Sequence, residues 1–147
     1  GDLENVHKKV NFHKISCEDL DGITKAMKDV DVVCHTAAFA HEGLSSFSPT
    51  SICSNNVTGS TSVFTAAIKN NVKRIVYCSS MARYGDILIP FKETDRVNPV
   101  DPYGVSKVAA ESSPVKVTFL KDEASLLEST VTTLLATTVP TAAPVSL

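Results

Sequence analysis

Residues 101–107 read DPYGVSK and place a phenol and an ammonium four residues apart at the predicted start of a helix. Asp101 suits the N-cap position, and Pro102 suits the first helical position, where its missing N–H costs nothing. With a rise of about 1.5 Å per residue, Tyr103 and Lys107 then lie roughly 6 Å apart on one face of the helix. This pair is therefore the first candidate for a functional site.

The chemistry of the pair is proton transfer. A free tyrosine titrates near pH 10, and a lysine cation beside it favours the phenolate, so the pKa of Tyr103 is expected to be lowered by Lys107. Such a pair can move a proton to or from the hydroxyl of a sugar or an alcohol. An isolated YxxxK is also typical of an ordinary helix start with a surface lysine, so the spacing alone assigns no function.

Two longer segments around the pair resemble a known family. Residues 76–86 read VYCSSMARYGD, and residues 98–111 read NPVDPYGVSKVAAE. In this order they resemble the extended short-chain dehydrogenase/reductase family, in particular its NAD-dependent epimerases and dehydratases of the nucleotide-sugar 4-epimerase kind. The resemblance implies that Ser80 hydrogen-bonds the reacting oxygen, that Tyr103 is the acid/base, and that Lys107 holds the tyrosine and the nicotinamide ribose. It implies a nucleotide-sugar substrate and NAD, with NADP not excluded.

The assignment to Ser80 depends on the YG pair at residues 84–85, which follows this serine at the family's spacing. The neighbouring Ser79 leaves an ambiguity of one residue. A hydroxysteroid dehydrogenase-like oxidoreductase is the alternative enzyme, because the HTAA segment at residues 35–38 also resembles that branch. The YG pair and the SKVAAE segment at residues 106–111 favour nucleotide sugars.

Apolar periodicity predicts an alternation of strands and helices before residue 80. The strands are expected at residues 10–15, 31–38 and 73–80, and the helices at residues 18–28 and 49–70. This order implies right-handed crossovers and a parallel sheet. The expected fold class is α/β, an incomplete Rossmann-type doubly wound parallel sheet with helices on both faces, formed by residues 1–111. The nearly unbroken apolar run of residues 31–38 predicts a strand buried on both faces.

Ligands in doubly wound folds bind outside the carboxyl ends of the strands, where small residues let a cofactor approach the backbone. Residues 36–38 end the second predicted strand in this way, although a strand can also end in small packing residues alone. The NNVTG segment at residues 55–59 resembles the family's NNVxGT segment, which implies that Asn55 touches the cofactor. The predicted cofactor contacts are Thr36, Ala37, Ala38, Asn55, Tyr103 and Lys107.

Residues 81–101 are expected to form a long irregular loop. Its position between Ser80 and Tyr103 predicts a lip that faces the substrate. His35 and His41 flank the small-residue segment, but a histidine near a strand end is more often hydrogen-bonded to backbone. No catalytic role is therefore predicted for either histidine.

Composition and charge argue against several functions. The net charge is −2 and the Lys and Arg residues are scattered, so no nucleic-acid partner is expected. The four cysteines form no CxxC pair and there is no HExxH motif, so no metal site is predicted and reduced thiols are expected in a cytoplasmic protein. No apolar run reaches the ~20 residues that span a bilayer, so no membrane partner is expected.

Two departures from the family pattern affect the expected activity. The chain contains no glycine-rich GxxGxxG turn, which would place the cofactor pyrophosphate at a helix N-terminus. Residues 112–147 resemble no part of the family, and their Ser/Thr/Pro-rich composition predicts a weakly ordered tail after Pro114 stops the helix. The chain thus reads as a fragment without the N-terminal turn and the C-terminal substrate domain. The remaining alternative is a non-catalytic truncated isoform, either a homodimer or a partner of full-length subunits.

Overall fold

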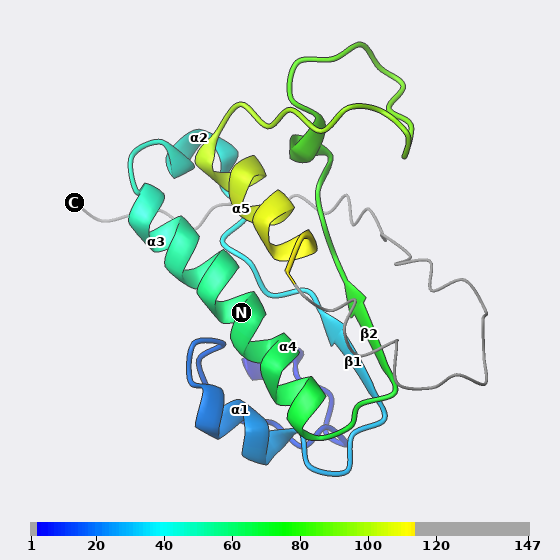
Figure 1. The fold of residues 1–147 in the computed structure, drawn as a ribbon. Coiled ribbons are helices and arrows are strands. Elements are labelled where there is room, and N and C mark those ends of the chain that lie inside the picture. Colours follow the sequence, from blue (N-terminus) through cyan, green and yellow to red (C-terminus); the bar gives the residue numbers. More distant parts are fainter. Residues whose placement is uncertain (1–2, 114–147) are drawn as a thin grey trace, which may run out of the picture.

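The computed structural model of the chain describes residues 3–113, and the predicted tail lies outside these residues from residue 114 onward. Figure 1 shows several helices arranged beside a small sheet. In chain order the elements are η1 (Leu3–Asn5), α1 (Leu20–Ala26), β1 (Val32–His35), α2 (Glu42–Ser45), α3 (Pro49–Cys53), η2 (Ser54–Thr58), α4 (Gly59–Lys69), β2 (Arg74–Tyr77), η3 (Met81–Tyr84) and α5 (Pro102–Glu111). Within this part of the chain, no helix has the length and apolar character that crossing a membrane requires.

The sheet pairs β1 with β2 in parallel, with Val33 opposite Ile75 and His35 opposite Tyr77. The chain between the two strands is mostly helical and includes α4, which confirms the parallel sheet and the strand–helix–strand part of the prediction from residue 31 to residue 80. The Cys78 N–H donates to the His35 carbonyl, so the pairing continues one residue beyond β2. Both strands therefore end at the same edge of the sheet.

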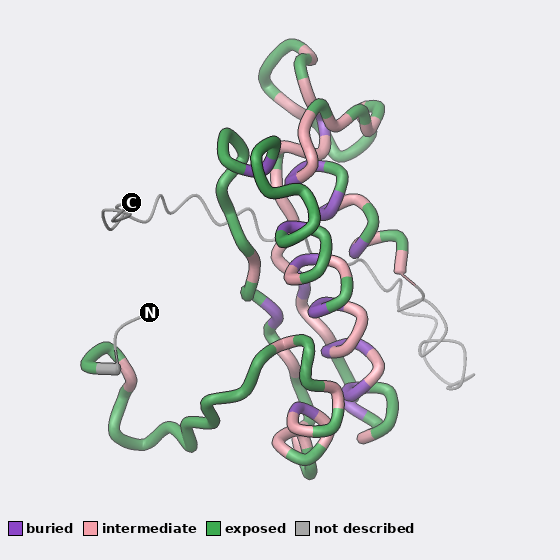
Figure 2. Tube along the Cα trace, turned by 90° about the vertical axis from the view of Figure 1, so that its left-hand side faces the viewer, coloured by how far each residue is buried: buried purple, intermediate pink, exposed green. Residues whose placement is uncertain are grey.

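The core lies between one face of this sheet and helices α1, α4 and α5. Its buried members are Ile23, Val63, Phe64, Ala66, Tyr77 and Ala110. On the other face of β1, Val32 is 55% exposed and Cys34 is also exposed. The prediction that this strand is buried on both faces is wrong, because the helices that reach the core within residues 3–113 cover one face only. Figure 2 shows the buried residues along the packed helices and strands.

Residues 10–15 form no strand, which contradicts the prediction. Val10 and Phe12 are 57% and 51% exposed, and the Val10 N–H bonds to the nearby His7 carbonyl. A strand needs a neighbour whose backbone completes its hydrogen bonds. Within residues 3–113 the sheet consists of β1 and β2, so this alternating segment has no strand beside it. Figure 2 shows the segment as an exposed, extended stretch apart from the helices.

The helix predicted at residues 49–70 is confirmed as one helical segment formed by α3, η2 and α4. The middle part, η2, is π-helical, and single π-helical turns occur frequently at functional sites. Helical periodicity places five residues of this segment on one face, and all five are buried: Ile52, Asn56, Gly59, Val63 and Ala66. Gly59 packs closely, since a Cβ on it would lie 3.1 Å from the Cys17 Cβ.

Candidate functional site

Helix α5 begins at Pro102, as predicted, and Asp101 holds its first turn. The Asp101 Oδ1 accepts a hydrogen bond from the Gly104 N–H at 2.8 Å, and Asp101 itself has the extended backbone of an N-cap. Gly104 approaches η3 so closely that a Cβ on it would lie 2.7 Å from the Ala82 carbonyl oxygen. This close approach places Tyr103 beside the segment that follows β2.

Tyr103 is 7% exposed, and the Ser80 side chain lies close enough to its phenol to affect the phenol's pKa. Burial is the main effect and raises the pKa of Tyr103 above its usual value of 10, while the nearby Ser80 hydroxyl partly lowers it. The negative charges of Glu42 and Asp101 raise it further. Tyr103 is therefore a neutral phenol at pH 7. The predicted lowering of this pKa by Lys107 is wrong for this structure.

Lys107 does not lower the pKa of Tyr103 because its ammonium contacts other groups. Lys107 is 3% exposed, and its Nζ donates to the Cys78 carbonyl at 2.5 Å and lies 4.6 Å from the centroid of the Tyr77 ring. Burial lowers the pKa of Lys107, and Cys78 and Glu111 raise it in part. The carbonyl and the ring thus take the ammonium contacts, so the cation does not offset the burial of the Tyr103 phenol.

Two neighbouring serines follow β2, and their environments differ. The Ser80 Oγ accepts from the Ala82 N–H at 3.2 Å, which caps η3, and the same side chain reaches the Tyr103 phenol. The Ser79 Oγ is buried and has no hydrogen-bond partner among residues 3–113. Of the two serines, Ser80 is thus the one that affects the pKa of the Tyr103 phenol.

The predicted cofactor segment follows the carboxyl end of β1, next to the end of β2. Thr36 and Ala37 are exposed, and Ala38 is half-buried. Asn55, in η2, is half-buried and donates through its Nδ2 to the neighbouring Asn56 Oδ1 at 3.3 Å. The three small residues therefore share one edge of the sheet with the acid–base candidates, and Asn55 connects to that edge through Asn56.

Asn56 is a site residue that the sequence pattern placed on a buried face without assigning it a role. It is 1% exposed. Its Oδ1 accepts from the Phe39 N–H at 2.7 Å, and its Nδ2 donates to the Phe39 carbonyl at 3.2 Å and to the Ser106 Oγ at 3.0 Å. Asn56 thus ties the segment after β1 to α5. The sequence signal that could have indicated a role for Asn56 is an amide side chain on a buried helix face, because a buried amide needs hydrogen-bond partners.

His35 is a buried structural residue at 4% exposure. Its partner differs from the backbone group that was predicted, because Nε2 lies 2.9 Å from the Ser60 Oγ. The imidazole also stacks on the Tyr77 ring, with 5.6 Å between the centroids. Burial, together with the nearby charge of Lys107, lowers the pKa of His35 to about 4. His41, by contrast, is exposed.

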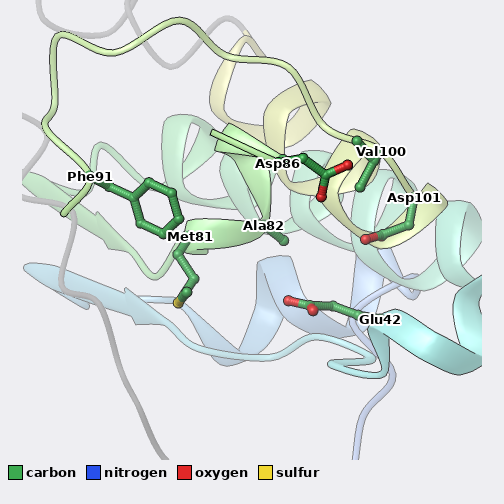
Figure 3. A pocket seen from close by; sticks show the side chains of 8 residues that line it. Glu42, Met81, Ala82, Asp86, Phe91, Val100 and Asp101 are labelled. Atoms are coloured by element: carbon green, nitrogen blue, oxygen red, sulfur yellow. The ribbon is translucent and has the colours of Figure 1, made fainter. Parts of the chain in front are cut away.

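A cavity of about 150 Å³ adjoins the start of α5. Figure 3 shows the carboxylates of Glu42 and Asp101 on one side of it and the side chains of Met81 and Phe91 on the other. The residues that the loop between Ser80 and Tyr103 contributes to its lining are Met81, Ala82, Gly85, Asp86, Phe91, Val100 and Asp101. This position fits a loop that faces a substrate. In the part of the chain that the structure describes, no cluster of His, Cys, Asp or Glu side chains could hold a metal ion.

The contact of Gly104 with η3 predicts a specific sensitivity. Gly104→Ala is expected to lower the free energy of unfolding by about 1–3 kcal/mol, because the new methyl group meets the Ala82 carbonyl and the Pro99 side chain. Gly43→Ala is the matched control, since a Cβ on Gly43 meets nothing within 4 Å. Urea unfolding of both variants measures the difference. Equal stability of the two variants would show that α5 and η3 can separate without cost.

A family model and similar known proteins place the chain in the same family. The model of the NAD dependent epimerase/dehydratase family matches residues 2–117. The UDP-glucose 4-epimerase of Lactobacillus helveticus is 35% identical over 114 residues, which cover 76% of this chain and 34% of that protein. The chain therefore spans about a third of the length of this relative.

Solved structures of similar fold carry related names. The UDP-glucose 4-epimerase of Thermotoga maritima, solved with UDP-glucose, superposes with a TM-score of 0.75 at 26% identity, over 82% of this chain and 40% of that one. The UDP-glucose 4-epimerase of Thermus thermophilus, solved with NAD, has a TM-score of 0.72 at 30% identity, over 76% of this chain and 37% of that one. These similarities support the Rossmann-type α/β fold.

Proposed function

Because the chain belongs to the NAD-dependent epimerase/dehydratase family, we propose that Ser80, Tyr103 and Lys107 form an acid–base site for a nucleotide sugar. The observation that carries the proposal is a buried phenol near a serine hydroxyl that follows β2, with a buried ammonium on the same helix. The test is the replacement of the phenol, Tyr103→Phe, within an active enzyme that carries this segment.

The substrate class follows from the relatives and from the cavity. The similar proteins above are named UDP-glucose 4-epimerases, and one was solved with UDP-glucose. Two of the carboxylates that line the cavity, Glu42 and Asp101, lie close enough to Tyr103 to affect its pKa. Carboxylates accept hydrogen bonds from hydroxyl groups, which are what a neutral sugar offers. The lining does not include Ser80, Tyr103 or Lys107, so we propose that the sugar extends from this cavity to the Tyr103 phenol.

In this mechanism Tyr103 removes a proton from the sugar hydroxyl, and Ser80 hydrogen-bonds the same oxygen. NAD, the cofactor of the family, supplies a hydride acceptor when it is bound. Since burial raises the pKa of Tyr103 and Lys107 does not offset this effect, the phenol has to lose its proton to solvent before Tyr103 can act as a base. Tyr103 in its neutral form returns the proton at the end of the reaction.

The residues at this edge fit the nicotinamide half of the cofactor. Small, accessible residues follow β1, and the buried Ser79 Oγ lacks a hydrogen-bond partner among residues 3–113. An additional polar group at this edge would satisfy that hydroxyl. The residues that would hold NAD are Thr36, Ala37, Ala38, Asn55, Tyr103 and Lys107.

The 147-residue chain alone is expected to bind NAD weakly. The proposed contacts reach the nicotinamide half, whereas the pyrophosphate depends on a glycine-rich turn at a helix N-terminus, and the sequence contains no such turn. Isothermal titration of the chain with NAD measures this affinity, with an intact UDP-glucose 4-epimerase as the positive control. A dissociation constant in the low micromolar range would contradict the expectation.

A non-catalytic role is the second candidate, and the two-stranded sheet favours it. Within the described residues each strand of the sheet pairs on one side only, and an unpaired strand edge invites pairing with another chain. The chain would then form a homodimer or join full-length subunits. The acid–base site and the non-catalytic role make different predictions for an enzyme that carries this segment. Only the acid–base site predicts that the turnover of this enzyme depends on Tyr103.

A further inference from the structure

The side chain beneath Lys107 belongs to Tyr77, the last residue of β2. We infer that Tyr77 is a positioning residue, whose ring is the platform that holds the Lys107 ammonium at the carboxyl end of β2. The inference rests on the proposed role of Lys107. It adds to the acid–base site a residue that does not touch the substrate and acts through the lysine.

The contact is close and buried. Tyr77 is 5% exposed, and the Lys107 Nζ lies 4.6 Å from its ring centroid, within the roughly 6 Å over which an aromatic face attracts a cation. The Cys78 carbonyl accepts a hydrogen bond from the same Nζ at 2.5 Å. The ring and the carbonyl thus contact the ammonium from two consecutive residues, Tyr77 at the end of β2 and Cys78 directly after it.

The ring is itself fixed by its neighbours. His35 of β1 stacks on it at 5.6 Å and an interplanar angle of 30°, and Phe64 of α4 meets it edge to face at 5.7 Å and 85°. The Ser60 hydroxyl holds the imidazole of His35 in turn. Side chains from the other strand and from a covering helix therefore set the plane of the platform.

The groups around the Lys107 ammonium affect its cationic form in opposite directions. Burial disfavours the cationic form of Lys107, whereas Cys78 and Glu111 favour it. The His35 imidazole, whose pKa is lowered by burial and, to a smaller extent, by the nearby lysine, stays neutral at pH 7. Burial also raises the pKa of Tyr77, so the platform is a neutral phenol. A neutral aromatic face compensates for part of the hydration that the buried ammonium has lost.

The test is an NMR titration of Lys107 in the 147-residue chain with ¹³C-labelled lysine, assigned by comparison with Lys107→Met. Tyr77→Leu is expected to lower the pKa of Lys107 by about one unit, the scale of a desolvated cation–π contact. Tyr77→Phe keeps the ring and should leave the pKa unchanged. Tyr77→Met also fills the space without a ring, and it should lower the pKa of Lys107 in the same way. It replaces Tyr77→Leu in the test if the leucine variant does not fold.

Phe64→Leu is the matched control, because it removes an aromatic ring from the same cluster without removing the face under Lys107. An unchanged Lys107 pKa in the ringless Tyr77 variants, or an equal shift in Phe64→Leu, would overturn the inference. In an active enzyme that carries this segment, loss of Tyr77 should lower kcat and Tyr77→Phe should restore it. If Lys107→Met left turnover intact, the proposed function would fail. The NMR titration would still show whether the Tyr77 ring stabilises the Lys107 ammonium.

Discussion

Tyr103→Phe is expected to lower turnover by about 10²-fold or more in a chimera that carries residues 3–111 in place of the matching segment of the Lactobacillus helveticus UDP-glucose 4-epimerase. The substitution removes the hydroxyl that exchanges a proton with the sugar and keeps the buried ring. General acid–base groups typically contribute effects of this size. The measurement is kcat with UDP-glucose, together with the amount of NAD that remains bound.

Tyr84→Phe is the matched control for this experiment. Tyr84 is 5% exposed, belongs to η3 and stacks on Phe91 at 5.2 Å, so its loss tests a buried tyrosine hydroxyl near the cavity but outside the proposed chemistry. Its turnover should match that of the unsubstituted chimera. If Tyr103→Phe kept full turnover, the acid–base role of Tyr103 would be refuted and the non-catalytic reading strengthened.

The second large effect concerns acid stability. Burial lowers the pKa of His35 from 6.5 to about 4 in the folded chain, so between these values the unfolded state binds a proton that the folded state does not. The contribution of His35 to stability is therefore complete above the unfolded value and declines as the pH falls through this window. By pH 4 the free energy of unfolding should have fallen by about 3 kcal/mol on account of His35.

Urea unfolding between pH 7 and pH 4 measures this decline. His35→Gln removes the titrating group, so its stability should be lower at pH 7 and should lose most of the pH dependence that His35 causes. His13→Gln, at an exposed position, serves as the control and should keep the slope of the original chain. Equal slopes in the His35→Gln variant and the original chain would contradict the assignment to His35.

Much of the fold could be read from the sequence because the relevant signals are local. Asp101 and Pro102 mark the start of α5 by the capping preferences of their own side chains. The buried face of residues 49–70 follows from helical periodicity, which needs only the neighbours one turn away. The family resemblance likewise rests on short contiguous segments, and the matching family model agrees with it.

Contacts between distant residues required the tertiary structure. The alternating pattern of residues 10–15 could not reveal that no strand lies beside it within residues 3–113. The spacing of Tyr103 and Lys107 correctly placed both residues on one helix. It could not show that the Lys107 ammonium donates to the carbonyl of Cys78, 29 residues earlier, or that burial raises the pKa of Tyr103.

The same holds for the polar partners in the core. His35 meets Ser60 across 25 residues, and Asn56 meets Ser106 across 50. By itself, the sequence determined the helical segments at residues 18–28, at residues 49–70 and from residue 102, and the two strands that pair, because each depends on side chains close together in the chain. The tertiary structure decided which polar groups are buried and what they bond, because burial and pKa depend on atoms that only packing brings together.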